Sequence, residues 1–314
     1  MKKLGKLGPL LGLVAVYVLF AVLGPSSFSS YRNFETMARQ TAIVGVLSLG
    51  MTMVIVSGGI DLSVGSIVAL VTVVIAWLLR ANVNPAWAAL GGIAAGAACG
   101  LLNGMLVVRL KVVPFIVTLG TLLLLRGAAK GLASEQKIDA PISWLNDLLS
   151  VLSPERHWMI FPVGVWIMII LALLVFLVLR YTRFGLHVFA VGANEQTARL
   201  CGVAVNRVKL MTYVLNAGFA GVAGLLQFSR LTVGDPTVAM GIELDAIAAV
   251  VIGGGSLSGG EGSVLGTIVG ALIMTVIRSG CTQMGLPNWV QEIVTGVIIV
   301  MAVALDRLRR HQAR

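Results

Sequence analysis

The chain contains the sequence VIVSGGIDLSVGS at Val54–Ser66, and a similar sequence, VIGGGSLSGGEGS, returns at Val251–Ser263. In both, an apolar run stops at paired glycines, passes a Leu-Ser pair and reaches Gly-Ser before apolar sequence resumes. Glycine permits positive φ angles and a close approach of another chain segment. In lipid, irregular backbone is tolerated only where it is buried in protein or lines a water-filled cavity. The pair therefore predicts two related halves, each with a helix interrupted near a solute pathway.

The composition excludes an ordinary soluble domain. Of the 314 residues, 58% are hydrophobic and only 11% are charged, whereas soluble domains contain about 25% charged residues. The apolar runs are long and continuous, as in membrane-spanning helices, and they lack the short alternating segments of a β-barrel. We therefore predict an all-α polytopic membrane protein with glycine-broken helices. It forms one transmembrane domain over residues 1–314, with halves near 1–158 and 159–314.

Ten apolar segments are expected to enter the membrane, with eight complete crossings as the alternative. Several are shorter than the roughly 20 residues that cross a bilayer, notably those beside the glycine breaks, which fit half-helices or re-entrant segments. The amphipathic Ser26–Gln40 is expected to lie at the outer interface. The expected segments are Leu10–Leu23, Thr41–Val56, Val64–Leu79, Ala86–Val108, Pro114–Gly131, Met159–Leu179, Leu210–Phe228, Ile242–Ile252, Val264–Arg278 and Asn288–Leu305.

The formal net charge of +10 does not indicate a nucleic-acid partner, because most Lys and Arg residues lie between or beyond the apolar segments. This distribution follows the positive-inside rule for cytoplasmic loops. A chain that starts inside and crosses ten times places both termini and residues 109–113 and 180–209 in the cytoplasm. It places Ser134–Trp158 outside, where acidic residues outnumber basic ones. Removing a re-entrant pair leaves this orientation unchanged.

Charged residues within apolar segments are costly, and by default they mark a pathway or an ion pair. Asp61 lies inside the first glycine break, where it either caps the next half-helix and braces the backbone or contacts the solute. Asn103 and Asn216 likewise either bridge two helices or hydrogen-bond a polar solute. The candidate pathway and gate residues are Gly58, Gly59, Asp61, Ser63, Asn103, Glu243, Asp245, Gly254 and Gly255.

No catalytic or metal-binding arrangement is recognisable in the sequence. The three cysteines and three histidines are scattered without ligand spacing, so neither a metal nor another cofactor is expected. Leu257–Glu261 reads LSGGE, close to the LSGGQ of ATP-binding-cassette (ABC) ATPases, but the chain has no GxxxxGK[ST] phosphate loop. A glycine loop without that lysine and its Mg²⁺ ligand cannot hold ATP. We expect no enzymatic activity in this chain.

The long basic segment 180–209 contains a short helix-like stretch. Asn194–Gly202 reads NEQTARLCG, with an N-cap candidate at Asn194 and a terminating glycine at Gly202. A short cytoplasmic helix between two membrane segments suits docking by a soluble partner. The alternative is a solvated loop that only satisfies the positive-inside rule.

Four longer stretches carry a family resemblance. They are SGGIDLSVGSIVAL (Ser57–Leu70), GLLNGMLVVRLKVVPFIVTLGTLLLLRG (Gly100–Gly127), NEQTARLCGV (Asn194–Val203) and ELDAIAAVVIGGGSLSGGEGSVLGTIVGAL (Glu243–Leu272). Together they resemble the permease subunits of bacterial ABC importers for monosaccharides of the ribose, xylose, arabinose and galactose type. They cover most of the chain in the family's order.

The resemblance implies an assembly in the bacterial inner membrane, surrounded by lipid. Its partners are a second permease subunit, identical or different, cytoplasmic ABC ATPases and an extracytoplasmic sugar-binding protein. ATP would drive alternating access of the pathway to the two sides. The segment 180–209 resembles an EAA-type coupling loop, in which Gln196, Thr197 and Ala198 take the E-A-A positions before Gly202. Its expected coupling helix comprises Asn194, Gln196, Thr197, Ala198 and Gly202.

Two further hypotheses remain open at this point. Related permeases carry nucleosides, branched-chain amino acids or a furanosyl signalling molecule on the same architecture. A different class, an ion-coupled secondary transporter, would use Asp61 as a proton or Na⁺ site.

Overall fold

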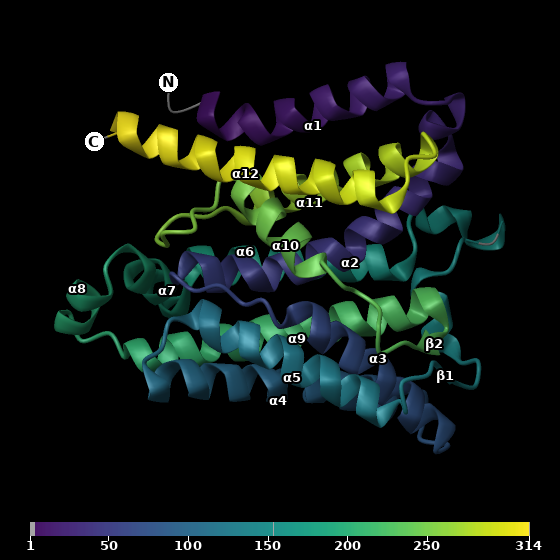
Figure 1. The fold of residues 1–314 in the computed structure, drawn as a ribbon, viewed down its shortest axis with the longest axis horizontal. Helices are drawn as coiled ribbons and strands as arrows, with labels where there is room; N and C mark the ends of the chain where they lie inside the picture. Colours follow the sequence, from purple (N-terminus) through teal and green to yellow (C-terminus); the bar gives the residue numbers. More distant parts are fainter. Residues whose placement is uncertain (1–3, 153, 314) are drawn as a thin grey trace.

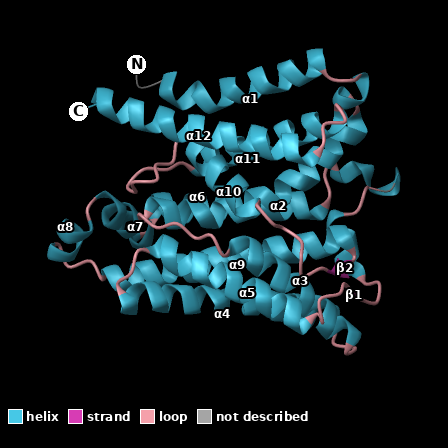
Figure 2. Cartoon of the chain, viewed as in Figure 1, coloured by secondary structure: helices cyan, strands magenta, loops and turns pink. Residues whose placement is uncertain are grey.

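The computed structural model describes residues 4–152 and 154–313 and is helical over most of its length (Figure 2). Most of the helices lie side by side along one direction (Figure 1). These are α1 (Leu4–Leu23), α2 (Tyr31–Val56), α3 (Val64–Arg80), α4 (Pro85–Leu110), α5 (Pro114–Leu132), α6 (Val163–Tyr181), α9 (Val205–Leu231), α10 (Ile242–Ile252), α11 (Val264–Gln283) and α12 (Asn288–Ala313).

The two ends of this bundle carry different elements. Helices α7 (Arg183–Ala193) and α8 (Glu195–Leu200) lie at one end, where α1 also begins and α12 ends (Figure 1). The strands β1 (Ile138–Asp139) and β2 (Val233–Gly234) lie at the opposite end and pair antiparallel. The connecting segments also contain three 3₁₀ helices, η1 (Ser26–Ser29), η2 (Trp144–Leu149) and η3 (Pro154–Met159). We refer below to the α7/α8 end and the β1/β2 end.

Several helices expose apolar side chains on the outer surface of the bundle. The most apolar windows of α4, α5 and α6 are only 22–28% buried, whereas that of α2 is 83% buried. Leu123 on α5 is 69% exposed and Leu173 on α6 is 57% exposed. Such large apolar faces are costly in water and match contact with lipid or a partner. The chain is therefore a polytopic membrane protein, as the composition predicts.

Within the described residues, six helices are long and apolar enough to cross a membrane, and three shorter apolar helices accompany them. Helix α10 has only 11 residues. Helices α3 and α10 are short and adjoin the glycine breaks. Either of them could cross the membrane together with the irregular segment beside it, so helix length alone does not give the number of crossings. The count of ten membrane segments and the division into two halves stay predictions.

The core is built on α9, which packs against α2, α3 and α4. Small residues on α4 allow the approach to α9. A Cβ added at Gly96 would lie 2.8 Å from the carbonyl oxygen of Ala217, and one at Gly100 would overlap the carbonyl oxygen of Tyr213. A branched side chain at either position on α4 would therefore push the two helices apart.

Ser26–Gln40 is not separated from the following apolar segment, because α2 begins at Tyr31 and continues without interruption to Val56. Its expected place at the outer interface stays a prediction. Two polar side chains in the early part of α2 are buried and hydrogen-bonded inside the protein. Asn33 Nδ2 donates to the Phe28 carbonyl at 2.8 Å, and Glu35 Oε1 accepts from the Leu152 amide at 3.0 Å. Amphipathic sequence therefore reflects internal hydrogen bonding here.

Candidate functional site

The paired glycines end α2 and α10 in the same way. Gly58 has a φ of +82° and Gly254 a φ of +90°, and glycine adopts this left-handed conformation without a steric penalty. The next amide then reaches back over the helix end: Gly59 N donates to Val54 O at 2.9 Å, and Gly255 N donates to Val250 O at 2.8 Å. These bonds form the same C-terminal motif in both repeats, which explains why each repeat needs two glycines.

Asp61 lies in the first glycine break, between α2 and α3, and has no exposed surface. Its Oδ1 accepts hydrogen bonds from the Ser63 amide at 2.9 Å and from the Ser63 hydroxyl at 2.6 Å. Its Oδ2 accepts from Asn216 Nδ2 of α9 at 2.9 Å. Asn103 Nδ2 of α4 donates to Ser63 Oγ at 2.7 Å. The network ties the break to two neighbouring helices, so the geometry favours bracing over solute contact for Asp61.

The two glycine breaks contact each other at the α7/α8 end. Gly260 N, in the second break, donates to the carbonyl oxygen of Val56, the last residue of α2, at 2.8 Å. Gly192, near the end of α7, packs on the same junction. A Cβ added at Gly192 would overlap the Val56 carbonyl oxygen and lie 2.6 Å from Gly260 N. Helix α7 thus touches both breaks through one glycine.

The short helix predicted over Asn194–Gly202 is confirmed as α8. Asn194 is its N-cap and accepts a hydrogen bond from the Thr197 amide at 2.9 Å. Gly202 follows its end with a φ of +83°. Ala198 is buried against the core, whereas Gln196 and Thr197 are exposed. The sequence thus predicted both ends of this helix, while its coupling role stays a prediction.

Glu195 anchors α8 to the start of α9. Its Oε2 accepts from Lys209 Nζ at 2.6 Å, and its Oε1 accepts from Arg199 Nη2 at 3.1 Å. The hydrogen bond from Lys209 holds the pKa of Glu195 below its usual value, and the charges of Lys209 and Arg199 act in the same direction. The sequence analysis missed this pair, although an acidic first turn on a helix flanked by basic residues is a recognisable signal.

A cleft of about 830 Å³ opens beside α8 and reaches both glycine breaks. Ser57 and Gly58 of the first break and Ser258 of the second line it, together with Gly192 and the polar residues of α8. The cleft therefore joins the predicted coupling helix to the segments predicted to form the gate. This junction could not be read from spacing, since it depends on contacts between residues far apart in the sequence.

The second pair of acidic candidates lies in the first turn of α10. Asp245 is 2% exposed and forms an ion pair with Arg278 Nη2 of α11 at 2.6 Å. Glu243 packs against Gly65 of α3, where an added Cβ would overlap its carboxylate. Asp245 therefore contacts α11, whereas Glu243 lies beside the first turn of α3, directly after the break that holds Asp61.

Comparison with known proteins identifies relatives along nearly the whole chain. Residues 33–303 match the family model described as "Branched-chain amino acid transport system / permease component". The ribose import permease protein RbsC of Escherichia coli (strain K12) is 38% identical over 95% of this chain and 93% of its own. That of Bacillus subtilis (strain 168) is 39% identical over 96% and 92%. The fructose import permease protein FrcC of Rhizobium meliloti is 35% identical over 97% and 86%. No solved structure matches the chain.

Proposed function

The chain belongs to the branched-chain amino acid transport system permease family, the membrane permease subunits of ABC importers, and from this premise we propose that it carries a monosaccharide. The observation that carries the proposal is its similarity to ribose and fructose import permeases at 35–39% identity over nearly the full length of both chains. The description of the family favours a second candidate, a branched-chain amino acid.

We infer that the α7/α8 end faces the cytoplasm and holds both termini. Basic residues gather in the segments at this end, among them Arg180, Arg183, Arg199 and Arg207, which fits the positive-inside rule. The β1/β2 end would then face the extracytoplasmic binding protein. Segment 134–158 contributes Glu135, Asp139 and Asp147 there. A second permease subunit completes the pathway in this proposal, and the exposed apolar helices offer surface for it.

The coupling role of α8 follows from its position. An ATPase docked on the exposed Gln196 and Thr197 would move α8 and, through Ala193 and Asn194, the end of α7. Gly192 would transmit that movement to both glycine breaks, because it contacts Val56 and lies beside Gly260. Rigid helices that meet at a packed junction shift together and change access to the pathway from one side to the other.

The same geometry argues against Asp61 as the site of a driving ion. Both of its carboxylate oxygens already accept hydrogen bonds, from Ser63 and from Asn216. These donors take three of the roughly four acceptor positions of the carboxylate, so the group is already satisfied without an ion. Energy therefore enters, in our proposal, through a separate ATPase at the α7/α8 end.

The cargo is tested with the full importer in proteoliposomes, using a cognate ATPase and binding protein. Uptake of radiolabelled D-ribose, D-fructose, L-arabinose and L-leucine is compared with ATP supplied on the ATPase side. We expect accumulation of one or more sugars and none of leucine. Accumulation of leucine without any sugar would overturn the monosaccharide proposal in favour of the second candidate.

A further inference from the structure

A cavity of about 220 Å³ lies among α2, α9, α10 and α11, toward the β1/β2 end. Helices α2 and α9 have 26 and 27 residues, whereas α10 has 11 and begins only at Ile242. The preceding residues, 235–241, run from β2 to α10 as irregular chain (Figure 1). They contribute Ala239 and Met240 to the lining of the cavity, which we call the α10 cavity.

Two basic side chains from distant parts of the sequence hold the irregular wall of the α10 cavity in place. Arg126 of α5 donates to the carbonyl oxygens of Pro236 at 3.0 Å and Val238 at 2.7 Å. Lys137 forms an ion pair with Asp235 at 3.2 Å. Backbone that is not helical is tolerated at membrane depth where protein satisfies it or where it lines a polar cavity. Here the protein satisfies the irregular segment through Arg126 and Lys137, and the segment also lines a polar cavity. The fold therefore stabilises the wall of this cavity.

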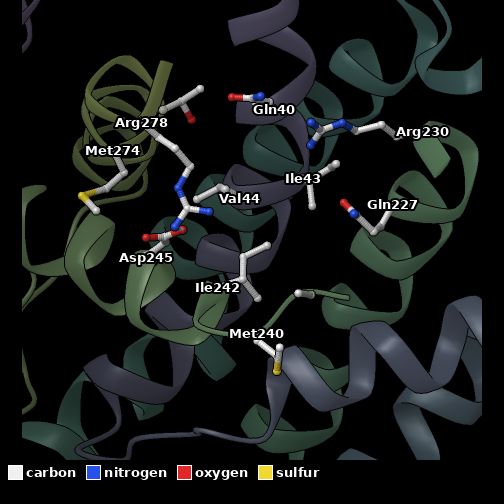
Figure 3. Close-up of a pocket in the computed structure, with 12 residues that line it drawn as sticks. Gln40, Ile43, Val44, Gln227, Arg230, Met240, Ile242, Asp245, Met274 and Arg278 are labelled. Atoms are coloured by element: carbon white, nitrogen blue, oxygen red, sulfur yellow. Dashed lines mark ion pairs between the residues drawn. The ribbon is translucent and has the colours of Figure 1, made fainter. Parts of the chain in front are cut away.

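The lining of the α10 cavity is polar on several sides. Figure 3 shows Arg230 and Gln227 of α9 on one side, Arg278 and Asp245 on the other, and Gln40 of α2 between them. Polar side chains in a membrane bundle are costly unless they are paired or serve a solute. Their convergence from four helices on one cavity indicates a solute.

Two acceptors in this lining have no donor in the described part of the chain. The Asp245 side chain is 2% exposed, and its Oδ2 pairs with Arg278, but its buried Oδ1 accepts no hydrogen bond. The buried Oε1 of Gln40 also lacks a donor. Arg230 and Gln227 supply N–H donors nearby. A hydroxyl group both donates and accepts, so it can satisfy an unpaired carboxylate oxygen and an unpaired N–H at once.

We propose that the α10 cavity binds one neutral, polyhydroxylated solute during its passage, through hydrogen bonds from its hydroxyls to Asp245 and Gln40 and from Gln227 to the solute. The proposal rests on the proposed monosaccharide importer and deepens it by naming a binding site. It moves solute contact away from Asp61, whose carboxylate already accepts from Ser63 and Asn216, to the outer side of α10. The volume equals that of roughly seven water molecules, which suits a pentose or hexose.

The test uses the complete importer in proteoliposomes and measures sugar imported per ATP hydrolysed, with the radiolabelled sugar that the unmodified importer accumulates. Gln227→Leu and Asp245→Asn each remove part of the hydrogen-bonding lining with little change in volume. We expect each to lower the ratio of sugar to ATP about tenfold, while ATP hydrolysis stimulated by the binding protein continues. Gln291→Leu, on α12 and bonded to the Leu286 carbonyl, is the matched control and keeps the ratio.

If these residues had only a structural role, their substitution would lower assembly and ATP hydrolysis together. The ratio of sugar imported to ATP hydrolysed therefore separates a structural role from solute binding. Thr275→Val, which also faces the cavity, provides a second small change should Asp245→Asn assemble poorly. An unchanged ratio in Gln227→Leu and Thr275→Val would overturn the binding site while leaving the sugar importer intact. If the unmodified importer accumulates leucine and no sugar, the polyhydroxylated ligand and the proposed function are both overturned.

Discussion

Substituting Gly192 by alanine tests whether α7 connects the coupling helix to the glycine breaks. The added methyl group would overlap the Val56 carbonyl oxygen and crowd Gly260 N, and both neighbours are backbone atoms that cannot rotate away. Overpacking of this kind costs about 1–3 kcal/mol. Loss of the bond between Gly260 N and Val56 O adds about 1 kcal/mol, and the better helix propensity of alanine returns about 1 kcal/mol. The expected net destabilisation is therefore about 1–3 kcal/mol, confined to the junction.

The assay compares ATP hydrolysis and solute uptake by the assembled importer in proteoliposomes, together with thermal unfolding in detergent. We expect Gly192→Ala to assemble and to hydrolyse ATP while importing less solute per ATP, because the two breaks no longer sit against α7. Gly218→Ala on α9 is the matched control, since no atom lies within 4 Å of its added Cβ. If Gly192→Ala matched Gly218→Ala in both stability and coupling, the reasoning about this junction would be refuted.

Three further predictions concern α8 and the first break. Ala198→Pro removes the hydrogen bond from the Ala198 amide to the Asn194 carbonyl and costs about 3 kcal/mol in a helix interior. We expect the variant to insert into the membrane without binding the ATPase, as measured by co-purification. Normal co-purification would contradict the docking role of α8. Asp61→Asn leaves the buried hydrogen-bond network short of acceptors at a cost of about 1–3 kcal/mol. The unfolding temperature should fall, while solute uptake remains dependent on ATP. If uptake were instead driven by an ion gradient and abolished by Asp61→Asn, the result would support a secondary transporter. The pKa of Glu195 is lowered in the folded protein, so its pairing with Lys209 stabilises the fold above the unfolded-state pKa of about 4.3. This stabilisation is lost as the pH falls through the lower folded-state pKa. The unfolding temperatures of wild type and Glu195→Gln should therefore converge at acidic pH, and a constant difference would argue against the pairing.

The sequence predicts the local features of this molecule well. The paired glycines at Gly58 and Gly254 predict interrupted helices because they need a positive φ at a helix end. Asn194 and Gly202 likewise predict the two ends of α8 because capping depends on residues a few positions apart. The membrane class follows from composition alone.

Contacts between distant segments were beyond the reach of such patterns. Gly192 looks like any other glycine near a helix end, and only the fold shows that two breaks from opposite ends of the sequence meet there. The α10 cavity lies between helices that are far apart in the sequence. The sequence around Gln227 or Gln40 therefore does not mark either residue as part of a cavity lining. The amphipathic pattern of Ser26–Gln40 likewise did not reveal that buried hydrogen bonds at Asn33 tie this segment to the rest of the bundle.

The source of energy for transport separates an ATP-driven permease from an ion-coupled transporter. Radiolabelled sugar uptake is measured in proteoliposomes that contain this chain alone or with its ATPase and binding protein, with ATP, with a proton or Na⁺ gradient, or with neither. We expect accumulation only when ATP, the ATPase and the binding protein are all present. Accumulation by this chain alone, driven by an ion gradient, would contradict it.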